Sequence, residues 1–529
     1  MNPRYIVAMI ILIAFMLFYP WYMSKITHRQ KEPPQIQQVE PPQYIGYQNV
    51  IKKEVVHKRI PFQTESFLLD FSKNDGSIRK VASEKHEVIG EPHPLAIINA
   101  DDMSQISPFS FNLTIVKDNK PINISPTDFK TNIGRLKATF TGIYEEGIEV
   151  IREIQETDEN VLHLSLKLKN LSESDITAYY TIGCASGISI DAPNDKALIE
   201  VLSFTNQRFY KEPFRRALSQ LKERVGQTNW VSIRSRYFCV LLKPEGRPGS
   251  AVVYSNLEDD RGVVGLRSQI LTLKPEGEYS ENFKLYVGPI NYENLKKIDP
   301  TATKIAELGM LHVISRMLLA TLNWVYSWTK NYGIAIIFLS IFISIVLSPL
   351  SIKSAISMKK MQEIQPKMQE IREKHKDNPQ KMNTELMETY KKHKVNPFGG
   401  CLPMLLQIPI FFALYQVLMR SVELRGAQFL WIKDLAGPDK AFRLPFSLPV
   451  IGEWLNMLPV FVIGAMYLQQ TLTSTQTVTE PSQKMLVYIM PLILGFAFYS
   501  MPSGFILNFL TSTLVNSGIQ ILVTHKLQK

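Results

Sequence analysis

The chain has 529 residues and a net charge of +11 at pH 7, and its length predicts at least two folding units. Such a basic chain would suit nucleic acid, but its Lys and Arg residues gather beside apolar runs, as they do in membrane proteins. Because neither a zinc finger nor a basic, aromatic-rich module occurs, the sequence argues against nucleic acid binding of its own.

The first apolar segment lies near the N-terminus. Residues 5–22 are nearly uncharged, are long enough to span a bilayer and are followed by no small-residue cleavage site. We therefore expect residues 1–24 to form a retained signal anchor. Residues 25–50 are rich in Pro and Gln, which predicts an extended linker.

Residues 51–300 alternate between apolar and polar positions with a period of two, as in 66–71, 161–168 and 282–287. Turn signals such as Asn74-Asp75-Gly76 separate these runs. So many short strands over this length predict a large β-sandwich.

The β region shows no sign of catalysis. It has no catalytic triad, paired carboxylates or Gly-rich phosphate loop, and its histidines have no evident partners: His57, His86, His93 and His163. Cys184 and Cys239 also fall here, and a disulfide between them is permitted by the compartment but not required by the spacing. We expect no enzyme activity, no metal and no other cofactor.

Residues 301–331 change to a helical pattern with apolar residues every three or four positions and two tryptophans, Trp324 and Trp328. The run also carries Lys304, Arg316 and Lys330. This mixture predicts an amphipathic helix that lies in the membrane interface and does not span the bilayer.

Five more apolar segments follow, at 332–353, 398–419, 456–471, 485–500 and 503–523. With the anchor they predict six transmembrane helices, five of them in a core at 332–523. The connecting loop 353–394 has an excess of Lys and Arg, which places it in the cytoplasm. Counting spans from this loop puts residues 51–300 in the periplasm. It puts the N-terminus and the tail 524–529 in the cytoplasm.

The cytoplasmic segment 354–395 predicts an antiparallel helical hairpin that breaks at Asp377-Asn378-Pro379. Its apolar positions recur at spacings of three and four: Met361, Ile364, Met368, Ile371, Met382, Leu386 and Tyr390. The methionines either join the two helices or form an adaptable binding surface, and we favour the first interpretation.

Polar side chains form stripes along the apolar segments. On the second, third and sixth spans these are Ser340, Ser344, Ser348, Gln407, Tyr415, Asn508, Ser512, Asn516 and Gln520. Since polar groups are costly against lipid, the stripes should face protein or water. The serines fit helix packing and a wet cavity equally well, whereas the amides of the sixth span favour a wet cavity.

Several motifs occur in order between about 303 and 523: 348–350 (SPL), 361–367 (MQEIQPK), 395–403 (VNPFGGCLP), 407–411 (QIPIF), 421–425 (SVELR), 490–491 (MP) and 501–504 (MPSG). In these the chain resembles the YidC family, the bacterial members of a membrane protein insertase superfamily with mitochondrial and chloroplast relatives. The anchor, linker and β domain resemble, more loosely, the Gram-negative version.

The resemblance implies a multi-span α-helical membrane protein with a periplasmic β-sandwich domain and a cytoplasmic helical hairpin. Such a protein inserts, folds and helps assemble inner-membrane proteins, alone or with the Sec translocon. It encloses a hydrophilic groove that is open to the cytoplasm and to lipid. Implied partners are nascent membrane proteins, the ribosome, the Sec translocon and membrane lipids. The substrate helix would slide along the third and fifth spans at Leu402, Pro403, Ile408, Pro409, Leu492, Ile493, Ala497 and Phe498.

One position departs from the family pattern. The arginine that usually lies in the groove aligns with Ser344, and the second span offers no other Lys or Arg mid-helix. The groove would then be polar but uncharged. We expect insertion to survive this change, because hydrating a polar segment requires no fixed charge.

Other functions remain to be weighed against an insertase. An assembly chaperone that depends on another translocase would make the same contacts. A channel or transporter is disfavoured, because the chain shows neither matched broken helices nor a ring of intramembrane charge. A sugar- or peptidoglycan-handling exported domain would place the activity in residues 51–295.

Overall fold

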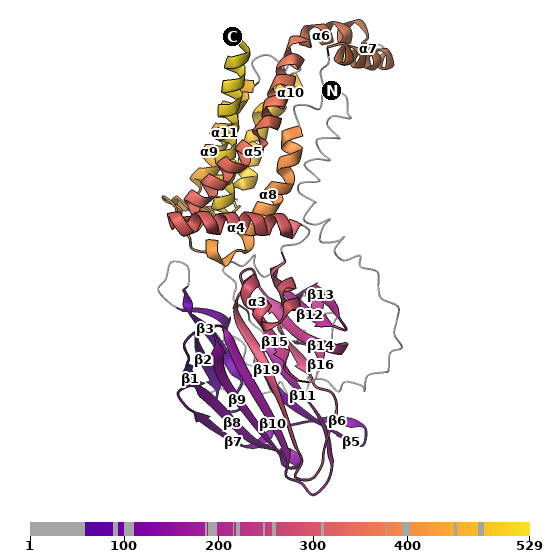
Figure 1. Ribbon diagram of the computed structural model, residues 1–529, viewed down its shortest axis with the longest axis vertical. Helices are drawn as coiled ribbons and strands as arrows, with labels where there is room; N and C mark the ends of the chain where they lie inside the picture. The colour runs from indigo at the N-terminus through magenta and orange to yellow at the C-terminus, as the bar shows by residue number, and fades with distance from the viewer. Residues whose placement is uncertain are drawn as a thin grey trace.

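The computed structural model describes residues 59–87, 94–99, 110–185, 188, 198–214, 216–217, 223–246, 249–256, 261–307, 311–376, 378–393, 402–448, 452–473 and 481–528. Figure 1 shows a β-rich domain and a helical bundle stacked along the long axis. The expected anchor and linker, residues 1–24 and 25–50, lie outside the described residues.

The described part of the β domain contains nineteen strands. The first ten are β1 (Arg59–Gln63), β2 (Phe67–Ser72), β3 (Ile78–Glu87), β4 (Pro94–Asn99), β5 (Phe111–Lys117), β6 (Lys120–Ile124), β7 (Pro126–Ile133), β8 (Lys137–Tyr144), β9 (Ile148–Asp158) and β10 (Val161–Asn170). The others are β11 (Ile176–Ala185), β12 (Glu200–Thr205), β13 (Arg208–Pro213), β14 (Glu223–Arg234), β15 (Phe238–Pro244), β16 (Gly249–Asn256), β17 (Arg261–Arg267), β18 (Leu271–Leu273) and β19 (Glu278–Pro289). A 3₁₀ turn, η2 (Glu145–Gly147), joins β8 to β9.

These strands form a β-rich sandwich, as the period-two pattern predicts. A four-stranded sheet has the order β1-β2-β3-β4, and a large sheet follows β6-β5-β11-β17-β16-β14-β15-β19-β10-β9-β8-β7. All of the pairings in these two sheets are antiparallel, so strands that are consecutive in the chain, such as β8, β9 and β10, can be joined by short turns. At the predicted turn after β2, Gly76 has φ +60°, and a Cβ there would lie 2.6 Å from the Phe140 ring.

Two expectations about single side chains change in the β domain. Cys184 and Cys239 are both buried and free, so they form no disulfide. The expectation that His163 has no partner is wrong, because its Nε2 lies 3.0 Å from Glu245 Oε2. These two residues are 82 positions apart, so only the folded sheet brings them together.

The remaining elements are mostly helical. They are α3 (Tyr292–Ile298), η4 (Pro300–Ala306), α4 (His312–Thr329), α5 (Tyr332–Glu363), α6 (Gln365–Lys374), α7 (Pro379–Lys392), α8 (Leu402–Arg420), η6 (Val422–Leu424), β20 (Phe442–Leu448), β21 (Gly452–Leu455), α9 (Met457–Thr473), α10 (Pro481–Phe498) and α11 (Ser503–Gln528). Two of them, α5 at Tyr332–Met361 and α11 at Ser503–Val523, are long and apolar enough to cross a bilayer by length and composition.

The amphipathic helix is confirmed as α4, with a shifted start. It buries Ser315, Leu318, Leu322 and Val325 and exposes Trp324 and Trp328 on its other side. Figure 1 shows it lying across the end of the bundle that faces the β domain. The helical pattern was expected from 301, but residues 300–306 form the separate 3₁₀ helix η4, whose Ile305 is buried in the β domain.

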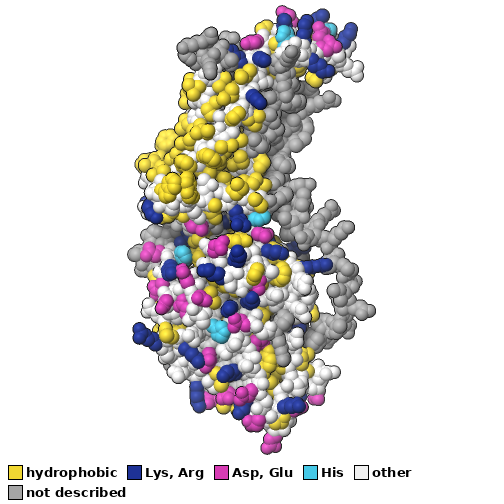
Figure 2. All heavy atoms as spheres, in the orientation of Figure 1, with side chains coloured by type: hydrophobic (Ala, Val, Ile, Leu, Met, Phe, Trp, Pro, Cys, Tyr) yellow, Lys and Arg dark blue, Asp and Glu magenta, His cyan; other side chains and the backbone are white. Residues whose placement is uncertain are grey.

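The helical hairpin is confirmed as α6 and α7. Met361, Ile364 and Met368 pack with Leu386 and Tyr390, so two of the three predicted methionines join the arms of the hairpin, and Met382 is not part of this cluster. His375 Nε2 lies 2.6 Å from Glu385 Oε2 across the turn. Figure 2 shows charged side chains on this hairpin and on the β domain, with an apolar surface on the bundle between them.

Candidate functional site in the helical bundle

Helices α5 and α11 pack side by side, and their polar stripes meet. The Ser340 hydroxyl lies 2.7 Å from Asn508 Oδ1 and 2.6 Å from Ile336 O. Both Ser340 and Asn508 are buried, at 0% and 3% exposure. The Ser340 hydroxyl has one proton, so it donates to only one of these two oxygens at a time. The pair therefore joins α5 to α11 and leaves one of the two oxygens able to accept another hydrogen bond.

Farther along α11, toward the end that carries α6 and α7, Ser512 differs from its neighbours. Thr511, Thr513 and Ser517 each donate to a carbonyl of their own helix at 2.8 Å. The Ser512 hydroxyl is buried and has no hydrogen-bond partner among the described residues. A buried hydroxyl without a partner is rare, because losing water without a replacement costs about 1–3 kcal/mol.

The other polar residues of the predicted set lie on α5, α8 and α11. Ser344 is buried on α5, whereas Ser348, Gln407, Asn516 and Gln520 are only partly buried. Apart from Ser340 and Asn508, no direct bond between two members of the predicted polar set appears among the described contacts.

Aromatic rings fill the bundle on the side of Asn508 nearer the β domain. The Phe411 ring of α8 lies 4.2 Å from Phe505 of α11, and Phe498 of α10 lies 5.0 Å from Phe509. Tyr415, predicted among the polar groove residues, packs its ring 5.4 Å from Phe505. Sequence analysis missed this cluster, because single aromatic residues in apolar runs carry no signal of which helices they join.

The predicted slide residues have mixed environments. Pro409, Leu492, Ile493 and Ala497 are exposed on the bundle, and Ile408 is partly buried. Phe498 is only 4% exposed and lies inside the aromatic cluster. Leu402 and Pro403 belong to α8, but their side chains fall outside the described part of the chain.

The β domain contacts the bundle through the turn between β14 and β15. Arg236 Nε donates to Met419 O at 2.6 Å, and its Nη2 donates to Ala436 O at 2.8 Å. These carbonyls end α8 and lie in the following loop, so one guanidinium joins the two parts of the molecule. Arg425 adds a second contact, from its Nη1 to Glu87 O at 2.8 Å.

An ionic cluster next to this contact joins buried Arg234 to partly buried Glu200 and exposed Lys211. Glu200 Oε2 accepts from Arg234 Nε at 2.6 Å, and Lys211 Nζ lies 3.1 Å from Glu200 Oε1. Burial alone would raise the pKa of Glu200, but Arg234, Lys211 and Arg420 of α8 lower this pKa to about 2. Sequence analysis missed these residues too, because charged residues on strands usually face solvent.

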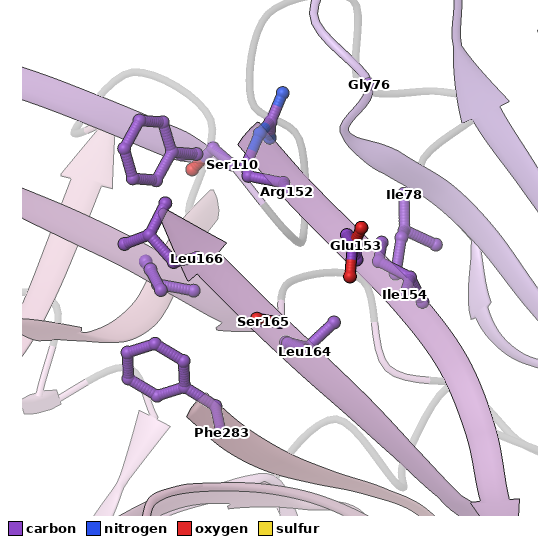
Figure 3. A pocket seen from close by; sticks show the side chains of 12 residues that line it. Gly76, Ile78, Ser110, Arg152, Glu153, Ile154, Leu164, Ser165, Leu166 and Phe283 are labelled. Atoms are coloured by element: carbon purple, nitrogen blue, oxygen red, sulfur yellow. The ribbon is translucent and has the colours of Figure 1, made fainter. Parts of the chain in front are cut away.

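A pocket in the β domain is too small to be a ligand site. Figure 3 shows Arg152 beside Leu166 and Glu153, with Phe283 on another strand. The cavity is about 50 Å³, which holds a few waters, whereas small-molecule sites measure about 300–1,000 Å³. The Arg152 guanidinium is engaged elsewhere, because it donates to Asp75 O and lies 5.2 Å from the Phe111 ring centroid.

An apolar-surfaced helical bundle with a polar internal face, joined to a large β-sandwich, defines a helical membrane protein with an extramembranous β domain. Comparison with known proteins then identifies its family. Residues 324–529 match the family described as 60Kd inner membrane protein, and residues 59–321 match the YidC periplasmic domain. The chain belongs to the YidC family of membrane protein insertases, a family of inner-membrane proteins and not of enzymes.

Individual relatives cover most of the chain. The membrane protein insertase YidC of Francisella philomiragia is 31% identical over 494 residues, which cover 89% of this chain and 85% of that protein. The YidC of Chlorobaculum tepidum is 28% identical over 476 residues, covering 86% and 79%. A crystal structure of an active YidC insertase with its first transmembrane domain resolved is 18% identical, covers 88% of this chain and 92% of its own, and has a TM-score of 0.39.

Proposed function

We propose that the chain inserts membrane proteins by hydrating a short polar segment of the substrate between α5, α8 and α11. The observation that carries this proposal is the buried, unpartnered hydroxyl of Ser512 beside the partly exposed amides of Asn516 and Gln520. Water or a substrate's polar group is the partner that this hydroxyl lacks. Ser344 and Ser348 of α5 and Gln407 of α8 complete the proposed groove.

The groove would be closed toward the β domain. The Phe411, Phe498, Phe505 and Phe509 rings occupy that half of the bundle, and Ser340 pairs with Asn508 next to them. A polar segment could therefore enter from the α6–α7 end and advance only part of the way. Its apolar helix would meanwhile leave along α8 and α10, where Pro409, Leu492, Ile493 and Ala497 are exposed. The proposed path also includes Leu402, Pro403 and Ile408.

The free-energy argument needs no nucleotide and no covalent step. When a polar segment enters hydrocarbon, each backbone N–H or C=O group that loses its hydrogen-bond partner costs several kcal/mol. A groove with hydroxyl and amide groups replaces part of the lost hydration, so the barrier falls. Because Ser344 is uncharged, the groove should accept neutral segments and gain little from acidic ones.

We further propose six membrane spans with both termini in the cytoplasm and residues 51–300 in the periplasm. The basic residues of 353–394 support this orientation. The proposed units are an anchor at 1–24, a linker at 25–50, the β domain at 51–300, an interfacial helix at 301–331, the insertase core at 332–523 with its hairpin at 354–395, and a tail at 524–529. The Sec translocon and the ribosome are proposed as partners that assist but are not required.

The test is insertion of a small single- or double-spanning protein into liposomes that contain only this purified chain. Protection of the translocated tail from added protease reports insertion. Replacing Ser512 and Asn516 together by Leu should lower the protected fraction about tenfold or more, because the groove becomes apolar. Thr513→Val is the matched control, since the Thr513 hydroxyl is satisfied within its own helix.

Two outcomes would count against the proposal. Equal loss in the Leu double variant and in Thr513→Val would mean that α11 packing, and not groove polarity, limits insertion. No protection by the unmodified chain, with a competent insertase active in parallel, would favour an assembly chaperone that depends on another translocase.

A further inference from the structure

The segment between α8 and α9 presents exposed apolar side chains at the end of the bundle nearest the β domain. They are Leu430, Trp431, Phe442, Phe446 and Trp454, between 36% and 76% exposed, and they are called the β20–β21 patch below. Large aromatic side chains in water usually mark an interaction surface.

The base of this segment is firmly held. Asp439 is 1% exposed, and its Oδ2 accepts from the first amides of α9, Met457 N and Leu458 N, both at 2.8 Å. Asn456 Nδ2 donates to Tyr499 O at 2.7 Å, which ties the hairpin to the end of α10. The patch is therefore displayed by a fixed support.

The turn that carries Leu430 and Trp431 is also fixed. Phe429 and Ile432 exchange two backbone hydrogen bonds of 2.9 Å, and Ile432 is buried. Leu430 adopts φ +53°, a left-handed conformation that is uncommon for a residue other than glycine. The fold thus holds an exposed leucine in an unfavourable backbone conformation beside an exposed tryptophan.

The two strands carry apolar side chains on both faces. Phe442 lies opposite Leu455, and Arg443 lies opposite Trp454; within the described residues β20 and β21 form a two-stranded sheet. An isolated two-stranded hairpin is marginally stable in water at best. Because both faces of the β20–β21 hairpin carry apolar side chains, the hairpin favours an amphipathic environment that contacts both faces.

The patch continues into the apolar outer surface of the bundle. The Trp431 ring lies 6.0 Å from the Phe461 ring of α9, and Phe461 and its neighbour Val460 are exposed there. Aromatic side chains next to a spanning helix typically lie at the level of lipid headgroups. On the proposed function the outer surface of α9 meets the bilayer, so this continuity favours lipid as the occupant.

The charges around the patch fit a lipid interface as well. Lys433 and Lys440 are exposed, while Asp434 and Asp439 are turned onto backbone amides. Arg443 and Glu453, which are also exposed, pair with each other at 3.1 Å. The exposed side thus keeps a net positive charge, which suits phosphate groups of lipids.

We propose that the β20–β21 patch inserts into the headgroup region of the lipid leaflet on the β-domain side, as a second interfacial anchor besides α4. The proposal rests on the proposed function in one respect, namely that the bundle spans the membrane. Two fixed anchors at different places on the bundle would set its depth and tilt, and hence the level at which the β domain stands above the lipid.

The test uses the full chain in nanodiscs of phosphatidylethanolamine and phosphatidylglycerol, in a Cys401→Ser background. An NBD fluorophore on Phe446→Cys, or on Phe442→Cys as a second reporter, is challenged with lipids that carry nitroxide at the headgroup or at acyl carbon 12. We expect at least twofold stronger quenching by the headgroup nitroxide. Ile270→Cys, 64% exposed in the β domain, is the matched control, and Phe342→Cys on α5 reports spanning.

The outcomes separate the two proposals. Quenching at 342 by the deep nitroxide without quenching at 446 would overturn the anchor and leave the spanning bundle intact. Absence of quenching at 342 would instead overturn the spanning bundle. A blue-shifted signal at 446 that no lipid quencher reaches would mean that protein, such as a second copy, covers the patch, and would also overturn the proposal.

Discussion

Arg236 is expected to hold the β domain against the bundle, and its replacement by Ala tests this. The side chain donates to Met419 O at 2.6 Å and to Ala436 O at 2.8 Å, two acceptors on different segments. A hydrogen bond from a charged donor contributes about 1.5–3 kcal/mol, and Arg236 is half-buried, so we expect a loss of about 2–4 kcal/mol for the pair.

Hydrogen exchange in the loop after α8 measures this loss locally. Leu435 N–H bonds to Ala427 O at 3.0 Å, and this loop is the part that Arg236 holds. Since about 1.4 kcal/mol corresponds to tenfold, Arg236→Ala should speed exchange of the Leu435 amide by about 30-fold or more. In Arg236→Lys the exchange rate of the Leu435 amide should fall between those of the unmodified protein and of Arg236→Ala, because an ammonium cannot span two acceptors as a guanidinium does.

Arg208→Ala is the matched control, because Arg208 is an exposed arginine at the start of β13, at the end of the β12–β14 pair away from Arg236. Equal exchange rates in Arg236→Ala and Arg208→Ala would refute the reasoning. That result would mean that contacts other than Arg236 hold the loop.

Three further predictions concern single side chains. Ser344→Arg should raise insertion of a substrate with an acidic tail several-fold in the protease-protection assay and leave insertion of a substrate with a neutral tail unchanged. If insertion of the neutral-tailed substrate required the arginine, the proposal of an uncharged groove would be wrong. Asp439→Ala should destabilise the bundle by about 1–2 kcal/mol in thermal unfolding, since it removes the cap of α9, whereas Asp439→Asn keeps an acceptor and should lose less. The pKa of Glu200 in the folded protein, about 2, lies below its ordinary value of 4.5. The contribution of Glu200 to the free energy of unfolding should therefore be full above pH 4.5 and fall as the pH drops toward 2. Glu200→Gln should remove this part of the pH dependence of stability. A stability–pH profile that is the same in Glu200→Gln as in the unmodified protein would contradict the prediction.

The sequence by itself determined the local elements. Period-two alternation predicted strands such as β2, β10 and β19, and the break at 377–379 predicted the turn between α6 and α7. Apolar spacing of three and four, together with two tryptophans, predicted α4. These features follow from sequence because they depend on neighbours within a few residues, where the periodicities of strand and helix apply.

Only the tertiary structure decided which side chains meet. Arg236 and Met419 are 183 positions apart, and no periodic pattern links a strand turn to the end of a distant helix. Likewise, Phe498 and Leu492 both lie in an apolar run, yet the first is buried in an aromatic cluster and the second is exposed. The unpartnered hydroxyl of Ser512 also depends on helix packing, because Thr511 and Ser517 have the same chemistry and satisfy it locally. The physical reason is that the rotation and depth of a packed helix are set by its neighbours and not by its own sequence.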